Sequence, residues 1–320
     1  MDTLPDLHAL ERARAIVYRT LQPTPQYAWP LLAERVGARI WVKHENHTPT
    51  GAFKVRGGLV HFDALAREAR PPDGVITATR GNHGQSVAFA ARAAGVPATI
   101  VVPHGNSREK NAAMRAFGAR VVEHGDDFQA AREHAIALAA RDGLRMVPSF
   151  APDLVAGVAS YWLEFFEAVP QVDVVYVPIG LGSGACAAIA ARDALRLHTR
   201  IVGVVSAHAP TYALSVDAGR VVEAPVSTVL ADGMACRVAE ADAVMLLRTG
   251  LERLVRVTDD EVALAMKQLF TDTHNTAEGA GAAALAAALQ ERARIAGRTV
   301  GIVLSGGNVD HDVFAQVLQR

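Results

Sequence analysis

The sequence predicts an α/β protein whose twisted sheets are parallel or mostly parallel and are covered by helices. From Gly74 onward, short runs of β-branched residues alternate with Ala-rich amphipathic stretches, a pattern typical of strand–helix–strand units. The chain has 320 residues, and 50% of them are hydrophobic, which is enough to fill more than one core. We therefore expect two lobes that share a cleft.

The expected elements follow from these runs in chain order. Strands are predicted at residues 40–43, 75–79, 99–103, 120–123, 172–178, 201–206 and 300–305. Helices are predicted to begin near Gly81, Ser107, Asp127, Asp153, Ser183, Thr211, Asp259, Glu278 and Asp310. The stretch from Pro148 to Pro152 is expected to cross between the lobes.

Charge and composition exclude several classes of partner and site. The net charge of −1 and the pI near 6.9 attract neither nucleic acid nor an anionic membrane surface. Residues 279–289 are apolar but too few to cross a bilayer, and residues 1–10 carry acidic side chains where a signal peptide would be basic. We expect a cytoplasmic protein. Cys186 and Cys236 form no CxxC pair, so we expect small core residues rather than a disulfide or zinc site.

Lysine is scarce in this chain. Of its 32 basic residues only four are lysines, namely Lys43, Lys54, Lys110 and Lys267. Arginine and lysine serve equally well as solvated charges. Where a lysine is present in this arginine-rich chain, we therefore ask whether its amine has a chemical role. Lys54 follows a loop and opens a helix, whose N-terminus lowers the pKa of an amine, and Phe53 beside it could cover a planar ring. Taken alone, this fragment still favours a solvated helix charge.

Three further segments place glycine and polar side chains at predicted strand ends. The first comprises Thr79, Arg80, Gly81, Asn82 and His83, and it opens a helix whose N–H groups would cradle a carboxylate. The second comprises Gly180, Leu181, Gly182, Ser183 and Gly184, a turn suited to phosphate. The third is Ser305, at the sheet edge where α/β proteins keep their ligands. Each segment alone also fits a plain cap or turn.

Taken together, Thr-Gly-Ala-Phe-Lys-Val-Arg-Gly, Gly-Asn-His-Gly-Gln, the glycine turn and Ser-Gly-Gly-Asn resemble the fold type II pyridoxal 5′-phosphate (PLP) enzymes of the threonine dehydratase and serine racemase family. The resemblance runs from about Ala15 to the C-terminus. It implies a tryptophan synthase β-like fold, with a large cofactor-binding domain from residues 1–46 and 149–320. Residues 47–148 would form a small domain that closes over the site. A homo-oligomer, dimer or tetramer, is also implied.

The resemblance implies a role for each of these segments. Lys54 would bond covalently to PLP and act as the catalytic base, with Phe53 against the cofactor face. Asn82 would bond to the ring hydroxyl, and Ser305 would contact the pyridine nitrogen. Residues 180–184 would bind the phosphate. The substrate carboxylate would bind at residues 79–83. Glu278 matches a family position near the cofactor.

The implied activity is an ammonia-lyase reaction on L-threonine or L-serine, with 3-hydroxyaspartate and phenylserine as alternative substrates. A neutral Ser305 hydroxyl at the pyridine nitrogen favours elimination over transamination. In serine racemases a serine precedes Gly-Asn-His and acts as a second acid and base. Here the residue is Arg80, which cannot act as a base, so racemisation is disfavoured. Arg80 either meets an acidic substrate side chain or lies outward in solvent, with the outward direction slightly favoured.

Two more departures from the family pattern limit the expectations. Val205 and Thr211 stand where many relatives place the carboxylates of a divalent-cation site, so we expect no metal there. The chain ends shortly after Ser305, so we expect no C-terminal regulatory domain. A non-catalytic PLP-binding protein stays open as an alternative. So does a nicotinamide-dependent oxidoreductase, which rests only on the shared α/β pattern and a glycine turn.

Overall fold

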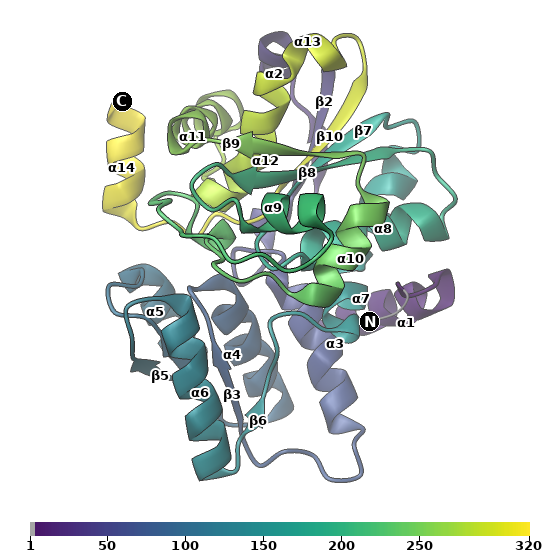
Figure 1. Cartoon of the computed structure of the whole chain (residues 1–320). Helices are drawn as coiled ribbons and strands as arrows, with labels where there is room; N and C mark the ends of the chain where they lie inside the picture. Colours follow the sequence, from purple (N-terminus) through teal and green to yellow (C-terminus); the bar gives the residue numbers. More distant parts are fainter. Residues whose placement is uncertain (1–3) are drawn as a thin grey trace.

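The computed structural model describes residues 4–320 and places two sheets in separate lobes (Figure 1). The six-stranded sheet has the order β1 (Gln26–Ala28), β2 (Arg39–His44), β10 (Thr299–Leu304), β7 (Val174–Pro178), β8 (Arg200–Ser206) and β9 (Arg253–Val257). The four-stranded sheet has the order β5 (Arg120–Glu123), β4 (Ala98–Val102), β3 (Val75–Ala78) and β6 (Arg145–Met146). Only β1 pairs antiparallel within these sheets, so the predicted mostly parallel α/β class is confirmed.

Helices connect and cover these strands. In chain order they are α1 (Leu7–Val17), α2 (Pro30–Val36), α3 (Lys54–Ala66), α4 (Asn82–Ala94), α5 (Arg108–Ala116), α6 (Phe128–Asp142), α7 (Pro152–Ala168), α8 (Ser183–Ala194), α9 (Thr211–Ala218), α10 (Ala241–Gly250), α11 (Asp259–Thr273), α12 (Gly279–Gln290), α13 (Arg292–Ile295) and α14 (His311–Gln319). Two short 3₁₀ turns are η1 (Glu45–His47) and η2 (Asp232–Met234). Between residues 4 and 320, no helix has the length and apolarity needed to span a bilayer.

Capping side chains mark three of the predicted helix starts, those of α5, α6 and α11. Each predicted start lies within one residue of an observed one. The Ser107 and Asp127 side chains, for example, each accept a hydrogen bond from a backbone N–H in the first turn of the following helix. The prediction for residues 1–10 lies partly outside the described residues, and α1 begins within that segment at Leu7.

The large sheet is buried on both faces because alternate residues of its strands point to opposite sides. Val175 and Val177 of β7 belong to a core shared with α7 and α8. Val174 and Tyr176 of the same strand belong to a second core shared with α11 and α12. Helices therefore enclose the sheet, and ligands have access to it at the ends of its strands.

The two sheets divide the chain in a simple way. All strands of the six-stranded sheet lie outside residues 47–148, and all strands of the four-stranded sheet lie inside that segment. This division supports the domain boundaries that we propose at residues 46/47 and 148/149. Helix α3 packs against both α7 and α4, so the loop that precedes it lies where the lobes meet.

Candidate active site

One pocket between the lobes collects every site residue that the sequence predicted. These residues are Phe53, Lys54, Thr79, Arg80, Gly81, Asn82, His83, Gly180, Leu181, Gly182, Ser183, Gly184, Glu278 and Ser305. They come from the start of α3, from the ends of β3, β7 and β10 and, for Glu278, from the residue before α12, and these segments are distant in sequence. Parallel strands of both sheets thus direct their carboxyl ends toward the same space.

The loop before α3 is held by the segment that follows β10. The Phe53 N–H donates to the Ser305 carbonyl at 3.0 Å, and the Gly307 N–H donates to the Gly51 carbonyl at 2.9 Å. Gly51 has φ of +66°, a conformation that favours glycine. These bonds place Lys54 at the first position of α3 and beside Ser305.

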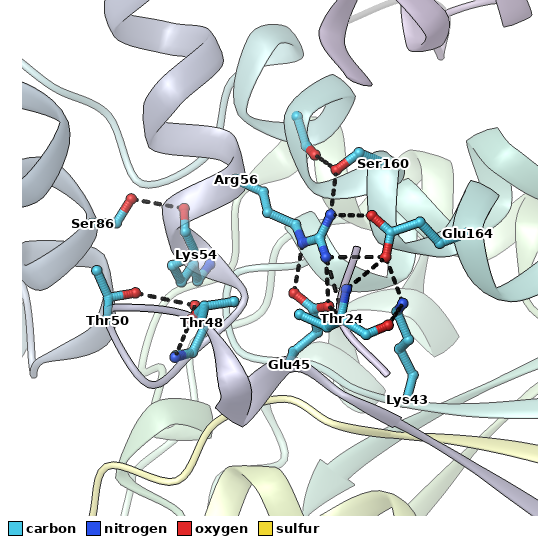
Figure 2. A network of polar contacts seen from close by, with 12 residues as sticks. Thr24, Lys43, Glu45, Thr48, Thr50, Lys54, Arg56, Ser86, Ser160 and Glu164 are labelled. Atoms are coloured by element: carbon cyan, nitrogen blue, oxygen red, sulfur yellow. Dashed lines mark hydrogen bonds and ion pairs between the residues drawn. The ribbon is translucent and has the colours of Figure 1, made fainter. Parts of the chain in front are cut away.

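A buried charge network anchors the same helix to the large lobe (Figure 2). The Arg56 side chain is fully buried and donates to Glu45 at 2.7 Å and to Glu164 at 2.6 Å. Lys43 also pairs with Glu164, so two cations balance two carboxylates. Glu164 lies on α7, and the network therefore joins the start of α3 to that helix. The amine of Lys43 is fully engaged there and takes no part in the pocket.

The Lys54 amine is buried beside the glycine turn of β7 and α8. Its Nζ donates to the Ser183 Oγ at 2.8 Å and lies 5.0 Å from the centre of the Phe53 ring. Burial lowers the pKa of this amine to about 8. A substantial neutral fraction near physiological pH is the property that a lysine needs to attack a carbonyl group.

The turn that starts α8 offers an anion site. Gly182 has φ of +95°, and a Cβ on Gly180 would lie 2.3 Å from a backbone oxygen, so both positions require glycine. In the described chain, the backbone N–H groups of Ser183, Gly184 and Ala185 have no hydrogen-bond partner. Such unpaired N–H groups at a helix start bind phosphate.

The turn that starts α4 offers a second anion site. The Thr79 Oγ1 accepts from the N–H groups of Gly81 and Gly84 at 2.9 and 3.2 Å, which fixes the turn. Gly81 has φ of +154°. Within residues 4–320, the N–H groups of Asn82 and His83 are left without a partner. They are available for a carboxylate.

His83 is held as a neutral side chain. It is buried, and its Nε2 lies 3.1 Å from the Thr77 Oγ1. Burial, together with the charges of Lys54 and His61, lowers the pKa of His83 to about 3. The imidazole can therefore form a hydrogen bond in the pocket but carries no charge near neutral pH.

A polar cluster joins the lobes at one side of the pocket. Asn82 donates to the Glu278 Oε1 and accepts from Asn308 at 2.9 Å. The Lys110 Nζ lies 2.7 Å from Asp232 and 3.1 Å from the Glu278 Oε2. Burial opposes the charge on Lys110, but the two carboxylates outweigh it and raise the lysine pKa. Burial raises the pKa of Glu278 despite the nearby lysine.

Several residues of the pocket were not predicted as site residues. Lys110, Asp232 and Cys236 line it, and only Lys110 had a signal in the sequence, namely the scarcity of lysine. Cys236 is a free, buried cysteine of a hydrophobic core, as expected, and it also lines the pocket. The Ser305 hydroxyl makes no hydrogen bond within the described part of the chain, so it is available to a ligand.

Arg80 also lines this pocket. Its residue is partly buried, and its Nε is buried without a hydrogen-bond partner. The outward direction that the sequence slightly favoured is therefore wrong.

The positions expected to lack a metal site hold neutral groups. Val205 is buried, and the Thr211 Oγ1 donates to the Arg237 carbonyl at 3.3 Å. Residues 4–320 contain no group of three or more His, Cys, Asp or Glu side chains that could hold a metal ion. That no cation binds here stays a prediction.

A family model described as pyridoxal-phosphate dependent enzyme matches residues 17–306. The chain belongs to this family. L-threonine ammonia-lyase of Geobacter sulfurreducens is 40% identical over 291 residues, which cover 90% of this chain and 72% of that protein. The processed form of threonine deaminase isoform 2 from Solanum lycopersicum superposes with a TM-score of 0.88 at 28% identity, covering 100% of this chain and 95% of that one. Maize serine racemase superposes with a TM-score of 0.89 at 26% identity, covering 99% and 98%.

The pocket fits the cofactor of the pyridoxal-phosphate family. PLP carries an aldehyde, a phosphate and a planar ring with polar substituents. This chain supplies a buried amine with a pKa of about 8, unpaired N–H groups at the start of α8, and the free Ser305 hydroxyl. The predicted fold type II class and PLP as cofactor are both confirmed.

Proposed function

We propose that this enzyme is an ammonia-lyase that converts L-threonine, L-serine or both into the 2-oxo acid and ammonia. The observation that carries the proposal is the buried Lys54 amine, which lies at the phosphate-type turn of a PLP-family pocket. Its relatives support the reaction, because the Geobacter protein and the tomato structure are named for threonine deamination.

The same proposal assigns the predicted site residues. Lys54 would hold the aldehyde carbon of PLP, and residues 180–184 would hold its phosphate through the N–H groups that now lack partners. Phe53 would cover one face of the ring, Asn82 would meet the ring hydroxyl, and Ser305 the pyridine nitrogen. The substrate carboxylate would bind the first turn of α4, at residues 79–83.

The reaction then depends on proton transfer by this chain's own residues. When bound, PLP supplies the electron sink that makes the Cα proton of an amino acid acidic. Lys54, once its amine is free, takes this proton, and its pKa of about 8 suits a base near neutral pH. Ser183 keeps the amine in place through its 2.8 Å hydrogen bond. The bond between Cβ and the hydroxyl then breaks, and the hydroxyl leaves with that electron pair and a proton as water. The released enamine tautomerises, adds water and gives the 2-oxo acid and ammonia.

Racemisation is the second candidate, because maize serine racemase shares the fold. A racemase needs a proton donor and acceptor on the face opposite Lys54. The position before Gly-Asn-His, which carries that group in serine racemases, holds Arg80 here. A guanidinium does not give up its proton at neutral pH, so the geometry favours the lyase.

A substrate panel tests the proposal. Purified enzyme is incubated with L-threonine, L-serine, threo- and erythro-3-hydroxyaspartate and phenylserine, and both 2-oxo acid and D-amino acid are measured. We expect 2-oxo acid from threonine or serine. We expect the yellow colour and the activity to disappear in Lys54→Ala and to persist in Lys267→Ala, a lysine on α11 outside the pocket. D-amino acid without oxo acid would favour the racemase.

The setting of the enzyme stays a prediction. The sequence predicts a cytoplasmic protein, and the family resemblance predicts a homo-oligomer. The proposed substrate is a small amino acid, which needs no protein partner.

A further inference from the structure

Arg80 is a cation in the pocket that no acidic side chain neutralises. Of the other two cations there, the Lys54 amine donates to Ser183, and Lys110 pairs with Asp232 and Glu278. No carboxylate within residues 4–320 forms an ion pair with Arg80, although its Nε is buried. Burying part of a guanidinium without an acceptor is unfavourable, so an anionic ligand would stabilise it.

Arg80, the reacting Lys54 and Cys236 line the same pocket. Burial raises the pKa of the Cys236 thiol, the charges of Lys54 and Arg80 oppose that rise, and the charge of Glu240 adds to it. The turn around Thr79 fixes the backbone on either side of Arg80. The charge is therefore held at the pocket between the lobes.

The number of anion sites exceeds the number of anions that threonine and PLP bring. The first turn of α8 has unpaired N–H groups for the phosphate, and the first turn of α4 has them for the α-carboxylate. Arg80 is a third site, and it is the one with a full positive charge. A substrate with a neutral side chain leaves it unpaired, whereas a side-chain carboxylate would pair with it, in the bidentate geometry that arginine favours.

We propose that Arg80 selects β-hydroxy amino acids whose side chain carries a carboxylate, as 3-hydroxyaspartate does, and that these are better substrates than threonine. This inference rests on the proposed lyase function and names its substrate class. Lys54 takes the Cα proton, the bond from Cβ to oxygen breaks, and the hydroxyl leaves with that electron pair and a proton as water. The enamine tautomerises and adds water, and ammonia leaves, so the products are a dicarboxylic 2-oxo acid and ammonia.

The test compares two substrates in three forms of the PLP-loaded enzyme: wild type, Arg80→Gln and, as the control, Arg141→Gln. Arg141 is an exposed arginine outside the pocket. In wild type, kcat/KM for one isomer of 3-hydroxyaspartate is expected to exceed that for threonine by about tenfold or more. Arg80→Gln should lower the ratio of the two kcat/KM values by about a hundredfold, the loss expected for a charged hydrogen-bonding pair. The control should leave the ratio unchanged.

A binding measurement supports the same test without catalysis. L-malate carries two carboxylates and L-lactate only one, and neither has the amine that reacts. Calorimetry on the PLP-loaded enzyme should show that Arg80→Gln weakens the binding of malate by about a hundredfold relative to the binding of lactate. An unchanged malate-to-lactate ratio would contradict the inference.

Other outcomes identify what would be wrong. If Arg80→Gln lowers kcat/KM by the same factor for threonine and for 3-hydroxyaspartate, Arg80 binds the α-carboxylate and the inference fails. If the variant loses PLP instead, Arg80 binds the phosphate and the inference fails. Oxo acid from threonine but not from 3-hydroxyaspartate overturns the inference and leaves the lyase function standing. No oxo acid from any substrate overturns the lyase function itself, and this substrate preference with it.

Discussion

At the scale of single residues, the chemistry depends on how burial changes the Lys54 amine. An exposed lysine is almost fully protonated at neutral pH and is a poor nucleophile. Burial of Lys54, with one hydroxyl as its only hydrogen-bond partner in the described chain, lowers its pKa to about 8. The fold thus produces reactivity by withholding solvent and acidic neighbours, whereas Lys110 keeps its charge because two carboxylates surround it.

The lowered pKa predicts how PLP-free protein takes up the cofactor. Only the neutral amine attacks the aldehyde, and about a tenth of Lys54 is neutral at pH 7. The pKa is lowered, so the neutral fraction rises as the pH rises through 8. We expect the rate of PLP uptake, followed by absorbance, to rise about tenfold between pH 7 and 9 and then to level off. A rate that is flat over this range would contradict the assignment of Lys54.

The residue-level site was largely predictable, because each motif combines an unusual residue type with a strand end. Lys54, Asn82 and Ser305 were chosen on that basis and line one pocket. The direction of Arg80 was not predictable. It depends on how the turn before α4 packs in the folded chain. There the turn lines the same pocket as residues far along the sequence, such as Cys236.

At the scale of elements, the turn before α8 has a backbone that only glycine fits. Gly182 has φ of +95°, and a Cβ there would lie 2.8 Å from the Ala243 Cβ. We expect Gly182→Ala to weaken PLP binding about tenfold or more, because the N–H groups of the turn would shift. Gly118→Ala is the matched control, since Gly118 has φ of +94°, no atom near its added Cβ, and a position outside the pocket. Fluorescence titration with PLP measures the affinity of both variants. An equal loss of PLP affinity in the two variants would contradict this role of Gly182.

The start of α3 depends on the charge network around Arg56. Replacing Arg56 by methionine leaves Glu45 and Glu164 as buried charges with too few partners. We expect the free energy of unfolding to fall by about 3–5 kcal/mol. Arg67→Met, at the end of the same helix, removes an exposed ion pair with Asp63 and should cost less than about 1 kcal/mol. Urea unfolding followed by circular dichroism compares the two, and similar losses would show that the network does not anchor the helix.

Very short strands were not predictable, and helix α1 was missed although it has 11 residues and the Asp6 cap. Strands β1 and β6 have three and two residues, too few to show any alternation, and they exist because neighbouring strands supply their hydrogen bonds. Strand β9, at the edge of the sheet, reads Arg-Leu-Val-Arg-Val, and its two arginines, three residues apart, break the alternation that would indicate a strand. Tertiary pairing, rather than local sequence, makes these strands.

At the scale of the whole molecule, the start of α5 joins the two lobes both within the pocket and outside it. Within the pocket, Lys110 of the small lobe pairs with Asp232 and Glu278 of the large lobe. Away from it, Asp310, which precedes α14, accepts a hydrogen bond from the Ser107 hydroxyl at the start of α5. Figure 1 shows α14 above α5, at the edge of the two lobes. Because this second contact lies outside the pocket, the effect of joining the lobes can be tested there without changing a pocket residue.

Asp310 acts as a helix cap supplied by the opposite lobe. Its carboxylate accepts from the N–H groups of Arg108 and Glu109, each at 3.2 Å, in the first turn of α5. Removing a capping carboxylate costs about 1 kcal/mol, which corresponds to about fivefold faster opening of that turn. We expect Asp310→Ala to accelerate hydrogen exchange at the Arg108 and Glu109 amides by about this factor. Asp312→Ala is the control, because it removes an exposed ion pair with Arg108 and a hydrogen bond from the Val313 N–H but takes no acceptor away from the α5 amides. Since the cap forms only when the lobes are together, unchanged exchange in Asp310→Ala would mean that α5 does not depend on the large lobe.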